Sequence, residues 1–312
     1  MKNKVLYITF LLFSLIFSQE LIAPQLHSMD LINYLKDNYK TSNVLGYSNA
    51  RDILYAEIDN NNGSVYGIYT NYSVVLDPNE DPSVHLYENG MNCEHLWPQS
   101  LGAGQDPAKS DMHHLRPCKE NVNSSRGNKP FNDIIDSQTN TWFWLNYQSG
   151  SIPQNNIDEY SESGSNSFEP REDVKGDIAR SMFYFHVMYS DVADQPFFEG
   201  QKNILKDWHY QDIADESEFD RTMSISNYQD NLPNPFIIDS TLVRRCYFYI
   251  EEPYNGDVNL DGNINVIDVV LLVDFILGYQ TFSESQLNQS DINNDSTINI
   301  IDVVILVENI LN

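Results

Sequence analysis

A repeat within residues 255–312 constrains the fold of this chain more than any other feature. The segments GDVNLDGNINVIDVVLLVDFILG and SDINNDSTINIIDVVILVENILN are related by an offset of 34 residues. Each begins with short oxygen-bearing side chains and continues with apolar residues at helical spacing. Oxygen ligands at positions 1, 3, 5, 7 and 12 of such a loop wrap a calcium ion, and position 7 donates through its backbone carbonyl. The repeat therefore predicts two Ca²⁺-binding loops, each followed by a helix.

The two loops carry matching residue types at the ligand positions. The predicted Ca²⁺ ligands are Asp257, Asn259, Asp261, Asn263 and Asp268 in the first loop, and Asp291, Asn293, Asp295, Thr297 and Asp302 in the second. Position 12 is aspartate in both loops, where the common EF-hand has glutamate. Position 6 is Gly262 in the first loop but Ser296 in the second. Since glycine makes the sharp turn there, we expect the second loop to bind more weakly.

This tail resembles the type I dockerin, a small all-α domain that binds a cohesin domain on another protein. The resemblance covers essentially all of 255–312 and implies two bound Ca²⁺ ions and a cohesin-like scaffold or cell-surface partner. Loop positions 10 and 11 are Val266-Ile267 and Ile300-Ile301, where cellulosomal dockerins usually carry hydroxyl or basic residues. Because of that departure, internal pairing and a role as a sorting or attachment tag are alternatives to cohesin binding.

The other end of the chain has the pattern of an export signal. Two lysines, the 13-residue apolar run VLYITFLLFSLIF and the small residue Ser18 match a secretory signal peptide. The run is shorter than the roughly 20 residues that a membrane-spanning helix needs. We therefore expect a signal peptide at 1–18 and a mature chain with no membrane span, secreted to the medium, the cell surface or the periplasm. A retained N-terminal anchor is the alternative.

Export also permits disulfide bonds. The chain has three cysteines, so at most one internal pair can form. Cys93 and Cys118 flank the catalytic segment described below, and we expect that pair rather than one with Cys246. Three thiols without a CxxC spacing do not favour a structural zinc site.

The charge is distributed unevenly along the chain. A net charge of −27 argues against a polyanionic partner, because phosphate contacts need lysine and arginine. Residues 109–129, however, hold five basic side chains against two acidic ones: Lys109, Arg116, Lys119, Arg126 and Lys129 against Asp111 and Glu120. A basic island in an acidic body permits phosphate binding at one place and discourages it elsewhere.

Residues around this island supply the chemistry of phosphodiester hydrolysis. MNCEHLWPQS contains Glu94 and His95, and SDMHHLRPCKENVNSSRGNKPF contains Asn123 and Arg126. Histidine is the natural general base near neutral pH and contributes about 10²–10⁴ in rate. Carboxylate and amide oxygens suit Mg²⁺, which keeps several waters and needs few protein ligands. A guanidinium suits a phosphate oxygen.

The segments CEHLWPQS, SDMHHLRP, VNSSRGNKPF, KGDIAR and NPF closely resemble the bacterial endonuclease I family of secreted nucleases. The resemblance spans most of 30–240 and implies an α+β nuclease domain at 19–250, built around a ββα-metal (His-Me) finger. It also implies cleavage of DNA, and often RNA, without marked sequence preference, to 5′-phosphate ends. Matched by position, His95 is the general base, and Glu94 and Asn123 are the Mg²⁺ ligands. Arg126 would contact phosphate or hold the finger's helix.

Further expectations concern the surroundings of this site. Adjacent strand residues point to opposite faces, so the chain should bulge or leave the strand where Glu94 and His95 meet. One of His113 and His114 should face inward. Helical periodicity is expected over 26–39 and 173–192, and His186 on the latter should be a packed core histidine.

Two other functions compete with the nuclease. One is a zinc-dependent hydrolase that uses His95, His113, His114 and a carboxylate as ligands. This alternative lacks the HExxH helix and leaves Asn123 without a role. The other is a catalytically inactive, calcium-dependent scaffold or adhesion component. It predicts calcium binding by 255–312 and no turnover with any metal.

Overall fold

The computed structural model describes residues 21–249, 256–293, 295 and 297–311. The signal peptide expected at 1–18 lies outside these residues. The chain divides into two compact units, Met1–Phe248 and Tyr249–Asn312, and each is described by itself. Among the helices of the described residues, none combines the length and apolar character needed to cross a bilayer.

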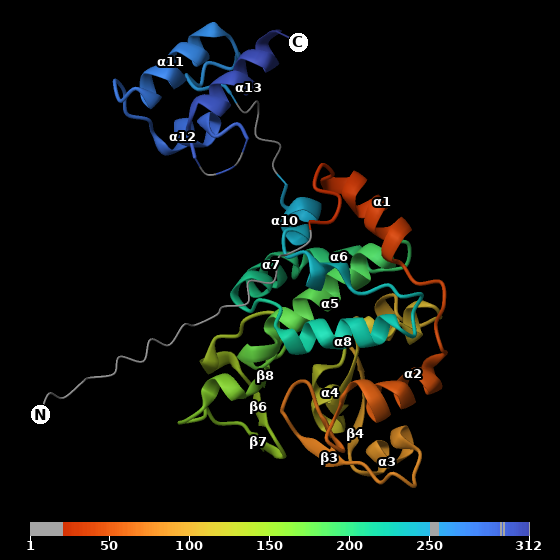
Figure 1. The fold of residues 1–312 in the computed structure, drawn as a ribbon. Helices are drawn as coiled ribbons and strands as arrows, with labels where there is room; N and C mark the ends of the chain where they lie inside the picture. The colour runs from red at the N-terminus through yellow and green to blue at the C-terminus, as the bar shows by residue number, and fades with distance from the viewer. Residues whose placement is uncertain (1–20, 250–255, 294, 296, 312) are drawn as a thin grey trace, which may run out of the picture. The chain divides into compact units, whose positions relative to one another are not determined.

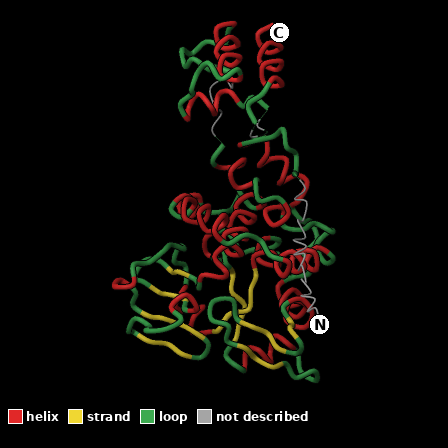
Figure 2. The backbone as a smooth tube through the Cα atoms, turned by 60° about the vertical axis from the view of Figure 1, so that its left-hand side comes forward, coloured by secondary structure: helices red, strands yellow, loops and turns green. Residues whose placement is uncertain are grey.

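The first unit is an α+β fold, as expected. Its strands gather at one end, and helices α1, α6, α7 and α10 lie at the other (Figures 1 and 2). The helices are α1 Ser28–Tyr39, α2 Tyr47–Ile53, α3 Pro82–Glu88, α4 Glu120–Arg126, α5 Lys175–Met188, α6 Gln195–Glu199, α7 Lys202–Gln211, α8 Glu216–Ser226, α9 Pro235–Ile238 and α10 Leu242–Tyr247. A π-helical turn, Leu54–Ile58, continues α2, and short 3₁₀ turns lie at Gln99–Leu101, Ala108–Ser110, Met112–His114, Asp136–Gln138, Ile157–Glu159 and Glu172–Val174.

Three small antiparallel sheets complete this unit. The first has the order β1-β2-β3, the second pairs β4 with β5, and the third has the order β7-β6-β8-β9. The strands are β1 Asn60–Asn61, β2 Ser64–Tyr66, β3 Ser73–Val75, β4 Met91–His95, β5 Leu115–Lys119, β6 Thr141–Trp144, β7 Tyr147–Ser149, β8 Ser161–Ser163 and β9 Phe168–Glu169.

Helix α5 is the central element of the core. Every one of its residues except Asp177 is buried, as expected for a helix that is surrounded by other elements. Gly176 is required at its start, because a Cβ there would lie 2.0 Å from the carbonyl oxygen of Asp212. The helices expected over 26–39 and 173–192 are present as α1 and α5. His186 packs in this core, with its ring stacked 3.8 Å from that of Phe198.

The β4–β5 hairpin and α4 form a ββα unit between two hydrophobic clusters. The strands pair in regular register from Met91 opposite Lys119 to His95 opposite Leu115. One cluster, on the side of α2 and α3, includes Met91 and Leu115. The other includes Val122 of α4 and much of α5. A ribbon held from both sides has little freedom, so the residues at its end are fixed in place.

The expected disulfide between Cys93 and Cys118 is wrong. Both thiols are free and buried. Cys93 lies opposite Pro117, whereas Cys118 lies opposite Asn92. Residues directly opposite one another share a face of the sheet, and the next pair along faces the other way. The two thiols therefore point to opposite faces of the hairpin, one into each hydrophobic cluster.

The second unit is a small helical domain. Its helices are α11 Val266–Ile276, α12 Glu284–Ser290 and α13 Ile300–Leu311, and its core consists of Val258, Leu272, Val303 and Leu306. Each loop of the repeat leads directly into a helix, α11 or α13. Many other apolar side chains of these two helices are exposed, including Ile267, Val270, Leu277, Ile301, Val304 and Leu311.

Candidate active site

Glu94 is a buried carboxylate on β4. Its side chain is only 3% exposed. The Tyr69 hydroxyl donates to Oε1 at 2.7 Å, and Nη1 of Arg126 lies 3.2 Å from the same oxygen. Burial raises the pKa of Glu94, while the Arg126 guanidinium acts in the opposite direction. The carboxylate is thus held in one orientation and has a compensating positive charge beside it.

His95 is the last residue of β4, and one backbone carbonyl fixes its tautomer. Its Nε2 lies 3.0 Å from the carbonyl oxygen of Lys109. A carbonyl can only accept, so Nε2 carries the proton and Nδ1 carries the lone pair. The Gln99 amide nitrogen lies 3.4 Å from Nδ1. Burial lowers the pKa of His95 to about 3, so the ring is neutral near neutral pH, and the lone pair of Nδ1 faces the Gln99 amide.

The two neighbouring side chains leave β4 on opposite sides. The sequence predicts a bulge or a departure from the strand here; the register is regular through His95, so the described hairpin contains no bulge at this point. Glu94 points toward Tyr69 and Arg126, whereas the ring of His95 lies 5.1 Å from that of Tyr47. Because the strand ends at His95, the two groups flank the end of the ribbon rather than share one of its faces.

Asn123 lies on α4 beside β4. Its amide nitrogen donates to Oδ1 of Asn92 at 2.7 Å and to the carbonyl of Cys93 at 3.2 Å. These bonds orient the amide, and its Oδ1 accepts no hydrogen bond from any residue in the described ranges. An oriented amide oxygen and a nearby carboxylate are the hard oxygen donors that Mg²⁺ prefers. This donor set fits the predicted metal.

Arg126 is buried and holds the ββα unit together. Its side chain is 1% exposed. Nη1 donates to the carbonyl of His95 at 3.2 Å, and Nη2 donates to that of Leu96 at 2.6 Å. With Glu94, these contacts join α4 to the end of β4. They support a positioning role for Arg126 over direct contact with phosphate.

Both histidines of the HH pair face inward, which corrects the expectation of one. His113 and His114 are 3% and 0% exposed. Nε2 of His113 donates to the carbonyl of Leu232 at 3.0 Å, and Nε2 of His114 to that of Ala108 at 2.6 Å. Asp111, which precedes them, accepts from the hydroxyls of Tyr184 and Tyr189, at 2.8 and 2.7 Å. This network anchors the start of β5.

The zinc alternative finds no support in these contacts. His95, His113 and His114 each direct Nε2 at a backbone carbonyl. Within the part of the chain that the structure describes, no group of three or more His, Cys, Asp or Glu side chains is arranged to hold a metal.

The structure adds site residues that the motifs did not indicate. Tyr69 contacts Glu94, and Tyr47 packs on His95 with the Arg51 guanidinium 4.6 Å and the Lys109 ammonium 5.2 Å from its ring centre. Tyr47, Arg51 and Tyr69 are distant in sequence from the motifs, so no local pattern indicates them. Gln99 lies only four residues after His95, so its proximity to His95 could have been predicted from the sequence.

The two tail loops repeat one set of contacts. In each loop, the backbone N–H of position 5 donates to the side chain of position 1. The N–H of position 3 donates to the side chain of position 12, and the N–H of position 7 donates to the side chain of position 5. The pairs are Asp261 to Asp257, Asn259 to Asp268 and Asn263 to Asp261, and then Asp295 to Asp291, Asn293 to Asp302 and Thr297 to Asp295, at 2.8 to 3.3 Å. Such turns curve the chain, but in the described residues the aspartates of each loop are not gathered into a group of three that could hold a metal. Calcium binding by the loops therefore stays a prediction.

Gly262 completes the first loop. Its φ of +82° lies in the region that favours glycine, and its N–H donates to Oδ2 of Asp257 at 2.8 Å. The corresponding position of the second loop, Ser296, lies outside the described residues.

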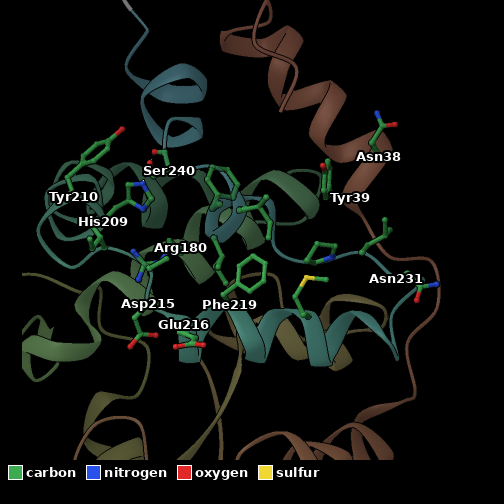
Figure 3. Close-up of a pocket in the computed structure, with 18 of the residues that line it drawn as sticks. Asn38, Tyr39, Arg180, His209, Tyr210, Asp215, Glu216, Phe219, Asn231 and Ser240 are labelled. Carbon is green, nitrogen blue, oxygen red and sulfur yellow. Dashed lines mark hydrogen bonds between the residues drawn. The ribbon is translucent and has the colours of Figure 1, made fainter. Parts of the chain in front are cut away.

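A cavity of about 920 Å³ lies elsewhere in the first unit (Figure 3). Tyr39 of α1, Arg180 of α5, His209 of α7 and Phe219 of α8 are among its lining residues. None of the predicted catalytic or magnesium-binding residues lines it. This cavity is therefore separate from the site at the end of β4.

Two family models match the chain. The model for Endonuclease I matches residues 27–241, and the model for the dockerin type I domain matches residues 255–311. Both resemblances inferred from the sequence motifs are thereby confirmed, as is the fold class of an α+β nuclease domain followed by a dockerin-like domain.

Two curated relatives are extracellular ribonucleases. The protein from Bacillus subtilis (strain 168) is 33% identical over 192 residues, which cover 54% of this chain and 58% of the relative. The protein from Bacillus amyloliquefaciens is 33% identical over 168 residues, which cover 47% of this chain and 50% of the relative. The chain thus spans between half and three-fifths of the length of these relatives.

Proposed function

Because the chain belongs to the endonuclease I family, we propose that it is an exported, metal-dependent endonuclease. It hydrolyses the phosphodiester bonds of DNA, and of RNA as well, to leave 5′-phosphate ends. The observation that carries this proposal is the fixed tautomer of His95, whose Nε2 proton is held by the Lys109 carbonyl. A neutral imidazole with an oriented lone pair, beside a buried carboxylate and an oriented amide oxygen, suits the activation of water near a metal-bound phosphate.

His95 acts as the general base. Nδ1 accepts a proton from the attacking water, while Nε2 keeps its own proton on the Lys109 carbonyl. A pKa of about 3 would make the ring a weak base. A bound phosphate brings negative charge close to His95, which raises the pKa of the imidazole toward the range in which proton transfer is efficient.

Glu94 and Asn123 would hold Mg²⁺, which when bound neutralises charge on the phosphate and on the leaving oxygen. Arg126 serves as a positioning residue. It keeps the carboxylate of Glu94 and the carbonyl of His95 at a fixed separation from α4. Lys109 and Arg51, which flank Tyr47 beside His95, are the cations placed to attract the substrate backbone.

The tail would attach the enzyme to another protein. We propose that its two loops each bind Ca²⁺ through the ten side chains and carbonyls predicted from the sequence. Exposed apolar residues at repeat-equivalent positions, such as Ile267 and Ile301, support contact with a cohesin-like scaffold or cell-surface protein. The extracellular relatives and the apolar N-terminus support a signal peptide at 1–18, a mature nuclease domain at 19–250 and a tail at 255–312.

The metal assignment is tested by titrating Mg²⁺ in a plasmid-cleavage assay with the full chain. Glu94→Gln keeps the shape of the side chain but removes its charge, and Asn123→Ala removes the amide oxygen. Both variants should need more Mg²⁺ and should lose at least about tenfold in kcat/KM, the usual cost of a weakened metal site. Glu88→Gln, on the exposed end of α3, is the matched control.

Circular dichroism would first establish that the variants fold. Because Asn123 is only partly buried, Asn123→Ala should remain folded. This holds even if Glu94→Gln is destabilised by loss of the Glu94–Arg126 ion pair. If both folded variants show the Mg²⁺ requirement of the wild type, these residues are not the ligands.

A further inference from the structure

A groove of about 620 Å³ lies beside the β6–β7 hairpin and the loop that follows it. Trp144, Leu145, Tyr147, Ile152 and Tyr160 contribute to its lining, and none of its described lining residues is charged. Tyr147 is 59% exposed, and Leu145 and Ile152 are each 43% exposed. Aromatic and aliphatic side chains gathered around an open hollow on a soluble protein indicate a binding surface.

The hairpin presents its aromatic residues together. Trp144 lies directly opposite Tyr147 in the register, so the two side chains share a face. The ring of Tyr160 lies 5.4 Å from that of Trp144. At the tip, Leu145 has a φ of +51°, a conformation that bulky residues rarely adopt and that two-residue hairpin turns usually give to glycine. Exposed leucine in a strained turn is consistent with a functional surface.

Two sets of contacts join the hairpin that borders this groove to the candidate active site. The N–H of Leu145 donates to the carbonyl of Thr70 at 2.7 Å. Tyr69, the residue before Thr70, donates a hydrogen bond to Glu94. On the opposite face of the hairpin, which Gln148 shares with Phe143 rather than with Trp144 and Tyr147, the amide of Asn121 donates to Gln148 at 2.9 Å. Asn121 is two residues before the proposed metal ligand on α4. The hairpin tip, and with it the Leu145 end of the groove, therefore lies near the surroundings of Glu94, whereas the face with Trp144 and Tyr147 is turned away from the Asn121 contact.

One basic side chain lies at the hairpin tip, where the groove ends, and a second contacts the opposite face of the same sheet. The Lys119 ammonium is 3.5 Å from the carbonyl of Asn146 at the hairpin tip. The Lys129 ammonium donates to Ser163 of β8 at 2.7 Å. A polyanionic backbone that passes along these lysines would bring its bases to an uncharged aromatic surface. Stacking rings beside a basic track are the features by which proteins hold single strands.

We propose that this groove binds an unpaired base next to the cleaved bond, so that the preferred substrate is single-stranded nucleic acid. The inference rests on the proposed nuclease function and extends it to a substrate class. Bases of a duplex are stacked and paired inside it, whereas an unpaired base can lie on Tyr147 and Trp144. Every base has an aromatic face, so such binding tolerates any sequence.

The test measures binding of short oligonucleotides to the full chain carrying His95→Ala, in EDTA, so that no turnover occurs. The ligands are a single-stranded DNA, the RNA of the same sequence and the corresponding DNA duplex. Adding Tyr147→Ala should raise the single-strand Kd by about five- to 150-fold, the range measured for loss of one base stack. Tyr147→Phe keeps the ring and should bind as the parent does. Tyr279→Ala removes an exposed aromatic ring from the tail and serves as the control.

The proposal is supported if Tyr147→Ala weakens binding of RNA, of single-stranded DNA or of both more than binding of the duplex. Loss on only one of the two single strands identifies which one the groove binds. The proposal is overturned if Tyr147→Ala leaves single-strand binding unchanged or weakens duplex binding equally. A wild-type chain that cleaves no nucleic acid in Mg²⁺ would instead refute the nuclease function, whatever the binding results.

Discussion

Arg126 is a buried motif residue whose contacts fit a positioning role. An arginine between two catalytic motifs would be expected to bind phosphate, yet its guanidinium is engaged by Glu94 and by the carbonyls of His95 and Leu96. The planar guanidinium presents several N–H donors in fixed directions toward these carboxylate and carbonyl oxygens. A lysine ammonium cannot reproduce that geometry. At this position, burial determines the role of the side chain more than its charge does.

Arg126→Ala should therefore destabilise the fold as well as abolish cleavage. Removing one partner of a buried ion pair leaves the other uncompensated, which costs about 3–5 kcal/mol. Urea unfolding would measure the change, with Arg244→Ala, an exposed arginine of α10, as the control within about 0.5 kcal/mol of wild type. Wild-type stability of Arg126→Ala would show that the guanidinium does not hold the ββα unit.

His209 makes a separate prediction about acid stability. It is 2% exposed, its Nε2 donates to the carbonyl of Ser240 at 2.9 Å, and burial lowers its pKa to about 4. Below its unfolded pKa of about 6.5, the unfolded chain binds a proton that the native chain does not, so acid destabilises the fold. The loss from this residue at pH 5 is about 2 kcal/mol and is complete near the folded pKa.

The His209→Gln variant checks this assignment, because glutamine can donate to Ser240 but does not titrate. Urea unfolding at pH 7 and pH 5 should show that the variant loses about 2 kcal/mol less than wild type on acidification. Equal losses in the two proteins would mean that His209 is not the acid-sensitive group.

Among the elements, the β4–β5 hairpin shows both the reach and the limit of sequence reasoning. The order of strand, strand and helix is the one that the resemblance to the endonuclease I family implies, as part of its ββα-metal finger. The two long helices follow from apolar periodicity. The opposite directions of Glu94 and His95 follow from ordinary strand alternation, and a bulge is expected only if both side chains are assumed to face one cavity. Contacts from Tyr47 and Tyr69 depend on tertiary packing and are equally absent from the motifs.

The hairpin register also predicts the redox chemistry of the chain. Since Cys93 and Cys118 face opposite sides of the ribbon, the protein should retain three reactive thiols after denaturation. A thiol titration in denaturant without reductant would count them. Adding reductant should leave the midpoint of thermal unfolding unchanged. If the titration instead counts only one free thiol and reductant lowers this midpoint, a disulfide forms.

For the whole molecule, the division into two compact units predicts that calcium acts on one of them. An ion that binds only the folded tail stabilises it by RT ln(1 + [L]/Kd), about 2.7 kcal/mol at a hundredfold excess over Kd. EGTA should therefore lower the melting temperature of the tail and leave that of the nuclease unit unchanged. Differential scanning calorimetry of the full chain would resolve the two transitions.

Asp268→Ala should have the same effect as EGTA on the first loop, since Asp268 is 0% exposed and organises that loop. Its tail transition should fall even in saturating calcium. A tail that melts identically with calcium, with EGTA and with the variant would contradict calcium binding by these loops.

The central claim is that His95 is the base of a metal-dependent nuclease. The most direct measurement is the rate of cleavage of plasmid DNA and of single-stranded RNA by the mature full chain in Mg²⁺, beside His95→Ala and an EDTA control. His85→Gln, at a half-buried histidine paired with Glu80, controls for the loss of any imidazole. We expect wild type and His85→Gln to cleave, EDTA to stop cleavage, and His95→Ala to lose about 10²–10⁴ in rate. Cleavage by His95→Ala at the wild-type rate would contradict the assignment of the base.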